Sequence, residues 1–288
     1  MADLQPPLSA HRLAAGIVDL ISLPEVYVQL QRVMDSKSAT ADKVAAVVSL
    51  DPALVAKMLK IANSALYNFS SPVETVSRAV NVLGTQQIHD LVLAAGVTGA
   101  FRDLPNELMD MAVFWQRSVQ TGILARTLGE GAGMHGGEAL FVRGLLHDIG
   151  HLVLYRHFPD LCRKALNEGE KGVCGLYAAE RELIGCSAIE VTAEICKSWG
   201  LPASFVETFV YLGEPEKAPH LGRETAMLHI ATQITHGMDT DLLLAEVIGE
   251  IRPGVWQLAK LPPDVASAAL DVTGIELMEA MYRLLMVD

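Results

Sequence analysis

This chain has few long apolar runs and few aromatic residues. Both features restrict the classes of protein to which it can belong. The longest apolar stretches, such as residues 91–101, fall far short of the roughly 20 residues that a membrane-spanning helix needs. Only 6% of the 288 residues are aromatic, and the alternating pattern of a half-buried strand is missing. Leu, Ala, Val and Ile recur instead at helical spacing. We therefore predict an all-α fold with no membrane partner.

Paired cysteines and a secretory leader are also missing from the sequence. The four cysteines lie ten or twelve residues apart, without a CxxC pair. In a large apolar chain this spacing favours free core thiols over a disulfide framework or a zinc site. The first seven residues contain no basic segment followed by an apolar core, so no secretory signal is expected. We expect a cytoplasmic protein.

Basic residues are too few and too dispersed for a general nucleic-acid binder. The chain has 22 Lys and Arg against 34 Asp and Glu, a net charge of −12. Binding to phosphates needs clustered cations, so we expect no nucleic-acid partner. No internal repeat or low-complexity tract is present, and 51% of the residues are hydrophobic, enough for a large core.

Helix-start and helix-stop signals divide the chain into four segments. Pro105 interrupts the helical pattern and marks the main boundary, at residues 102–106. We expect an N-terminal helical extension at 1–22 and a first helical half at 23–103. A second helical half should follow at 104–238, and C-terminal helices at 239–288 should pack on it.

Residues 144–155 carry polar groups inside an otherwise apolar stretch. The apolar positions recur at helical spacing, which predicts the buried stripe of a single helix. Into this stripe the sequence places His147, Asp148 and His151, and buried polar groups are costly unless they find partners. The stretch is therefore the candidate site. Its apolar positions are Leu145, Leu146, Ile149, Leu152 and Val153.

Spacing alone leaves two interpretations of these polar residues open. On one helix, adjacent side chains diverge by about 100°, so His147 and Asp148 would not contact each other but could both reach a metal on the helix flank. His147 and His151 have the i, i+4 spacing of zinc-binding helices, although Asp148 is shorter than the glutamate of HExxH and no third ligand is evident. The alternative is a hydrogen-bonded junction between helices.

Several stretches of the chain resemble a known family. Residues 144–150 (Gly-Leu-Leu-His-Asp-Ile-Gly) resemble the signature of the HD phosphohydrolase superfamily, whose members bind one or two metals through an H…HD…D set. Other stretches, between Leu23 and His236, are similar to HDOD domains, the HD-related output domains of bacterial signalling proteins. This resemblance implies an N-terminal helical subdomain packed on an HD-like helical bundle. These HDOD-like stretches are residues 23–26, 51–67, 79–84, 114–118 and 198–202.

The resemblance also implies that part of the metal set is lost. The HD pair falls on His147 and Asp148, but the first histidine of the superfamily falls at Arg117 and the last aspartate at Thr232. The lysine that often follows the pair is His151. A guanidinium repels a divalent metal, so we expect Arg117 to pair with Asp148 and to replace the metal's charge.

Three functions follow from this resemblance. We expect a non-catalytic signalling output module that acts by protein–protein contact with an unidentified signalling partner, without catalytic residues or a cofactor. The first alternative is a metal-dependent phosphohydrolase acting on a nucleotide or cyclic dinucleotide. Its divalent metal would be bound by His147 and Asp148, and residues such as His151, His135 or Glu138 would replace the missing ligands. The second alternative is an anion or nucleotide sensor, in which Arg117, Arg143 and His151 line the vacated metal pocket.

Overall fold

Every regular element that the structure describes is helical. In this computed structural model no strand occurs within the described ranges, so the predicted all-α class is confirmed. Within the same ranges, no helix combines the length and the apolarity needed to cross a bilayer. The predicted boundary around Pro105 lies outside them. The described residues are 9–18, 25–36, 40–63, 71–101, 108–134, 137–168, 172–238 and 242–274.

The helices form two compact units, and each is described by itself. The division of the chain into four segments stays a prediction. The smaller unit contains α2 (Glu25–Met34), α3 (Ala41–Val48), α4 (Pro52–Ala62), α5 (Val76–Leu83) and α6 (Thr85–Phe101). The larger unit contains α1 (Ala10–Val18), α7 (Met111–Gly131), α8 (Gly137–Leu146), α9 (Ile149–His157), α10 (Pro159–Glu168), α11 (Val173–Leu183), α12 (Ala188–Ser198), α13 (Ala203–Val210), η1 (Pro215–Lys217), α14 (Gly222–Gly237), α15 (Leu244–Glu250), α16 (Pro253–Ala259) and α17 (Val265–Thr273).

Local signals account for the helix starts in the smaller unit. Thr40 accepts a hydrogen bond from the amide of Lys43 at 3.3 Å, which caps α3. Asp51 accepts one from the amide of Leu54 at 3.1 Å, ahead of the proline that opens α4. A side-chain oxygen at this position satisfies an amide that has no partner within its helix.

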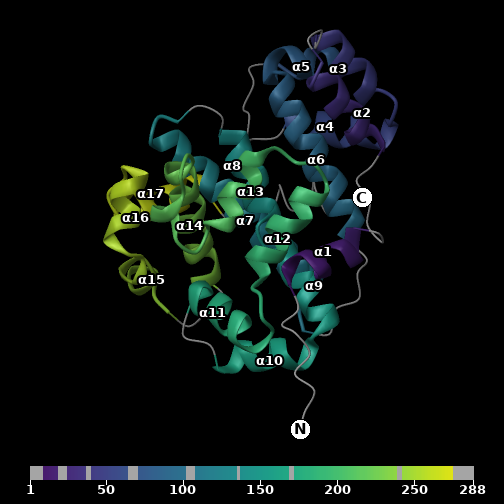
Figure 1. Cartoon of the computed structure of the whole chain (residues 1–288). Coiled ribbons are helices and arrows are strands. Elements are labelled where there is room, and N and C mark those ends of the chain that lie inside the picture. The colour runs from purple at the N-terminus through teal and green to yellow at the C-terminus, as the bar shows by residue number, and fades with distance from the viewer. Residues whose placement is uncertain are drawn as a thin grey trace. The chain divides into compact units, whose positions relative to one another are not determined.

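Close helix contacts define the centre of the larger unit. α7 packs against α8 and α14, while α12 packs against α9 and α13 (Figure 1). A β-carbon at Gly144 of α8 would overlap the backbone of Gly122 in α7. A β-carbon at Gly150 of α9 would overlap the carbonyl group of Ala188 in α12. Both glycines of the 144–155 stretch are therefore needed for backbone-to-backbone packing.

Candidate functional site

The His147–Asp148 pair lies in a turn, so the prediction of one continuous helix over 144–155 is wrong. α8 ends at Leu146 and α9 begins at Ile149. The break exposes backbone groups that a helix would pair, and α12 satisfies two of them. The hydroxyl of Thr192 accepts a hydrogen bond from the backbone amide of Gly150 at 2.9 Å, and it donates one to the carbonyl oxygen of His147 at 3.1 Å. The tertiary partner thus stabilises the interruption.

The turn lets both side chains face one site, where Asp148 meets several nitrogen atoms. The Nε2 atom of His147 is 3.7 Å from Oδ1 of Asp148. Nη2 of Arg117, from α7, lies 3.3 Å from Oδ2 of Asp148. Nδ1 of His151 lies 2.8 Å from Oδ1. All four residues are buried, with Asp148 only 1% exposed.

Glu180 on α11 joins the site through His151, and the sequence did not single it out. Nε2 of His151 lies 2.9 Å from Oε1 of Glu180, so the two groups form an ion pair when the ring is protonated. The other carboxylate oxygen of Glu180 accepts a hydrogen bond from the backbone amide of Ala188, the first residue of α12, at 2.8 Å. The rings of Tyr155 and Tyr177 stack on the imidazole, at centroid distances of 5.2 and 5.9 Å. A single glutamate in a helical segment gives no sequence pattern that would predict its contact with His151.

These contacts balance charge within the protein. Burial alone would lower the pKa of His151, but Asp148 and Glu180 raise it to about 10, so the ring is an imidazolium. Burial alone would raise the pKa of Asp148, but the positive charge of His151 and its hydrogen bond hold this pKa well below its usual range. Arg117 and His151 supply two positive charges against the two carboxylates. The four charges sum to zero.

His236 is a further member of the site that the sequence analysis missed. It lies on α14, one turn after Thr232, and its Nε2 atom is 3.4 Å from Oδ2 of Asp148. Burial and the Arg117 charge lower the pKa of His236 to about 3, so its ring is neutral. Thr232 is itself buried, and its hydroxyl has no hydrogen-bond partner among the described residues. We refer to Arg117, His147, Asp148, His151, Glu180 and His236 as the HD cluster.

Of the remaining predicted residues, the structure describes the side chain of Arg143 but not those of His135 and Glu138. The guanidinium carbon of Arg143 lies 5.1 Å from the centre of the Phe205 ring. Both ring nitrogens of His151 face carboxylates, so His151 is not placed to complete a metal site.

The HD cluster contains donor atoms that could bind a metal, but its positive charges oppose the binding of a cation. His147, Asp148 and His236 each offer a ligand atom, and these three atoms lie within 4.8 Å of one another. The Nε2 atoms of both histidines are buried and make no hydrogen bond in the described part of the chain. However, the carboxylate of Asp148 is already balanced by Arg117 and His151. A divalent ion therefore fits only when Arg117 is withdrawn from Asp148.

A His-Asp dipeptide in the smaller unit shows that the dipeptide alone does not make a site. His89 and Asp90 are buried within α6, and Nδ1 of His89 is 3.2 Å from Oδ1 of Asp90. The same oxygen accepts a hydrogen bond from the side-chain Nε2 of Gln86 at 3.0 Å. The ligand group of three described above does not recur here among the described residues.

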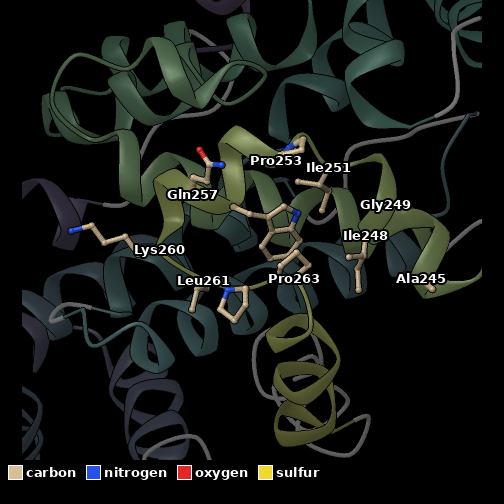
Figure 2. Close-up of a pocket in the computed structure, with 11 residues that line it drawn as sticks. Ala245, Ile248, Gly249, Ile251, Pro253, Gln257, Lys260, Leu261 and Pro263 are labelled. Carbon is tan, nitrogen blue, oxygen red and sulfur yellow. The ribbon is translucent and has the colours of Figure 1, made fainter.

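A hollow on the larger unit is lined by none of the HD cluster residues. It has a volume of about 590 Å³ and lies along α15 and α16, where Ile248, Ile251, Trp256 and Leu261 provide apolar walls and Lys260 adds a cation (Figure 2). Residues of α12 and α13, including Val206 and Val210, line another hollow of about 560 Å³. Both are surface features suited to binding an apolar group.

An all-α bundle with a His-Asp pair at a junction of central helices defines an HD-like protein. The chain belongs to the HDOD domain family, whose sequence model matches residues 20–215. A protein of Treponema pallidum (strain Nichols) that is described as uncharacterized is 24% identical over 216 residues. That match includes 72% of this chain but 41% of the relative, so the chain spans about two fifths of that protein's length.

Solved structures share the fold over nearly the whole chain. An HDOD domain protein of unknown function from Geobacter sulfurreducens is 20% identical, with a TM-score of 0.74 and coverage of 97% of this chain and 99% of its own. A Shewanella amazonensis SB2B protein, provisionally named a phosphohydrolase, is 26% identical, with a TM-score of 0.72 and coverage of 96% and 98%. A Marinobacter aquaeolei VT8 protein, provisionally named a signal transduction protein, is 21% identical, with a TM-score of 0.65 and coverage of 99% and 68%.

Proposed function

We propose that this protein is a non-catalytic signal-transduction module that acts by contact with a partner protein. In this proposal the HD cluster is a structural centre, in which an internal ion pair replaces the metal of the superfamily. The observation that carries the proposal is the contact between Arg117 and Asp148, at 3.3 Å. A catalytic site must leave a position open for water or substrate. Arg117 instead contacts the carboxylate that would hold a metal.

Burial of the cluster supports the same proposal. His147, His151 and Glu180 have no exposed surface, and Arg117 is 8% exposed. A phosphate ester could not contact these side chains unless the helices around them moved. The zero net charge of the four central ionised groups also provides no attraction for an anionic substrate.

Apolar surface features support action through a protein partner. Leu243, directly before α15, is 70% exposed, Met238 is 47% exposed, and a separate hollow with apolar walls lies along α15 and α16. Exposed apolar side chains and concave apolar surfaces are both typical of interaction sites. The negative net charge and the dispersed cations disfavour a nucleic-acid partner.

Turnover assays test the non-catalytic role directly. Native protein and His147→Ala should both lack hydrolysis of cyclic dinucleotides and of simple phosphate diesters, with Mg²⁺, Mn²⁺, Zn²⁺ or Co²⁺ present, while an active phosphodiesterase in parallel confirms the assay. Metal-dependent turnover by native protein that disappears in His147→Ala would overturn the proposal. A pull-down with native protein as bait should then provide the partner for binding studies.

The second candidate is a metal-dependent phosphohydrolase. His236 favours it, because this residue adds a third ligand atom to His147 and Asp148. The Shewanella relative, provisionally named a phosphohydrolase, agrees with it as well. This candidate requires that Arg117 leaves Asp148 and that substrate reaches a buried site. The same turnover assay distinguishes it from the signalling module.

An anion sensor has less support. It needs Arg117, Arg143 and His151 around one pocket, but His151 already lies between two carboxylates. Arg143 lies over the Phe205 ring. A thermal-shift screen of nucleotides tests this alternative, since a bound ligand raises the melting temperature.

A further inference from the structure

The first helix, α1, packs on a unit from which it is separated in the sequence. The residues of the smaller unit, Ser22–Asp103, lie between α1 and the rest of the larger unit, which resumes at Leu104. α1 nevertheless lies against α12 and α9 of the larger unit (Figure 1). Nδ1 of His11 is 2.9 Å from Oε2 of Glu194, a contact across 183 residues of sequence. α1 thus occupies α12 in the way that a tethered peptide ligand occupies its receptor.

Few of the described side chains of α1 hold it on α12. Leu13 and Ala14 are buried, whereas the other described side chains of this helix are exposed or half-buried. The side chain of His11 is 72% exposed, and ion pairs in exposed positions contribute little to stability. A β-carbon at Gly16 would meet no atom within 4 Å. Because a helix of nine residues is marginally stable by itself, these contacts provide a limited hold.

The surface that α1 covers continues into a hollow. The other carboxylate oxygen of Glu194 lies 3.4 Å from Nζ of Lys197, one turn further along α12. Lys197 lines the hollow of about 560 Å³ described above, to which no described residue of α1 contributes. Val210 in the same hollow is 45% exposed. A segment that follows α12 from Glu194 to Lys197 would therefore gain apolar contacts that α1 does not make.

We propose that α1 covers a docking surface on α12, and that a partner protein binds there through an amphipathic helix that displaces α1. This inference rests on the proposed action through a protein partner. The face of α1 indicates the chemistry of the partner helix. It needs a large and a small apolar residue in the places of Leu13 and Ala14, and a basic residue in the place of His11 to face Glu194. Such a helix in an apolar groove is a common mode of peptide recognition.

Displacement of α1 makes binding depend on how often the surface is open, since only chains with α1 released can bind the partner. The probe is a fluorescein-labelled peptide with the sequence of residues 5–18, and fluorescence anisotropy of titrations with the full chain measures its binding. Leu13→Asp in the full chain places a carboxylate at a buried position and should release α1. We expect this variant to bind the peptide roughly tenfold or more tightly than native protein does.

Two controls test the contacts that the proposal uses. Ala15→Asp introduces the same residue at an exposed position of α1, so this variant should bind the peptide as native protein does. A peptide that carries His11→Glu should bind the Leu13→Asp protein several-fold more weakly than the original peptide, because two carboxylates would then meet at Glu194. Equal binding of the two peptides would contradict the assigned role of Glu194.

A folded Leu13→Asp protein that binds the peptide no more tightly than native protein would refute the displacement. If Leu13→Asp fails to fold, as circular dichroism would show, Leu13→Ala removes most of the same contact and is judged by the same criteria. Light scattering identifies the other possible occupant, because a native dimer that Leu13→Asp dissociates would assign the surface to exchange of α1 between two copies. The readout is peptide binding, so its failure is distinguishable from the turnover that would overturn the proposed function.

Discussion

Asp148 is the side chain on which the HD cluster depends. Its two oxygens meet nitrogen atoms of His147, His151, Arg117 and His236, which come from α7, α9, α14 and the turn itself. Substitution of one partner in a buried charge pair leaves the other charge uncompensated. Substitution of Asp148 should therefore lower the free energy of unfolding by more than any one of its contacts contributes.

Asp148→Ala should lower the free energy of unfolding by roughly 3–5 kcal/mol, because it leaves Arg117 and His151 with less opposite charge. Arg117→Leu in the same chain should recover part of that loss. Chemical denaturation of native protein, both single variants and the double variant, with a chelator present, gives the coupling free energy. Simple additivity would mean that Arg117 does not compensate the charge of Asp148.

His229 should make the stability of the larger unit depend on pH. Burial lowers its pKa to about 4, although its Nδ1 atom lies 2.7 Å from the carbonyl of Leu212. The unfolded chain takes up this proton near pH 6.5, and the folded chain does so only near pH 4. The contribution of neutral His229 to the free energy of unfolding is therefore present above pH 6.5 and is lost as the pH falls from 6.5 towards 4. Between pH 7 and pH 5 this loss amounts to about 2 kcal/mol.

His229→Asn should reduce that slope while its side-chain amide, at the position of Nδ1, keeps a donor for Leu212. Denaturation of native and variant protein at about pH 7 and pH 5 measures the difference, and titration of other groups cancels between the two proteins. A variant that loses stability with pH as steeply as native protein would show that His229 titrates normally. The HD cluster is unchanged in this comparison.

Sequence reasoning found some members of the site but not others. His147 and Asp148 stood out because adjacent polar residues interrupt an apolar stretch. Glu180 and His236 did not, because each lies singly in a helix and its partners come from other helices. Their roles depend on packing that one sequence does not encode in any local pattern.

At the scale of elements, the turn between α8 and α9 was the main error in the sequence prediction. Apolar periodicity continues from Leu145 to Val153 as if one helix ran through, because both helices bury nearly every side chain around the turn. Periodicity reports burial on one face, so it cannot detect a break where all faces are buried. The starts of α3 and α4 depend instead on the neighbouring residues Thr40 and Asp51, whose side chains cap these helices, so such starts can be recognised from local sequence.

The contact between α9 and α12 should tolerate no side chain at Gly150. Gly150→Ala places a β-carbon on the carbonyl group of Ala188, so the helices must separate. We expect a loss of about 1–3 kcal/mol in the free energy of unfolding. Gly16→Ala in α1 is the matched control, since nothing lies within 4 Å of the new β-carbon. It should stabilise the protein slightly, through helix propensity.

Chemical denaturation of both glycine variants checks this prediction. Equal effects of the two substitutions would mean that α9 and α12 can move apart without cost. Circular dichroism of each variant would show whether the helical content is retained, so that a change in packing is distinguished from the loss of a helix.

At the scale of the whole molecule, charge determines which partners can approach. With a net charge of −12 and dispersed cations, the protein should not bind DNA or RNA measurably near physiological salt. Fluorescence anisotropy with labelled single- and double-stranded oligonucleotides measures this. A micromolar or tighter complex that weakens as salt rises would reveal a local basic surface, and would direct the search for partners towards nucleic acids.

The hydroxyl of Thr192 also has a consequence for how the chain folds during synthesis. It bonds the backbone of the turn at His147 and Gly150 across 45 and 42 residues of sequence. The ribosome therefore releases the turn well before the helix that completes its hydrogen bonds. Until α12 docks, the amide of Gly150 lacks this acceptor and can exchange its hydrogen with water. Exchange at this one amide would report when the centre of the nascent protein closes.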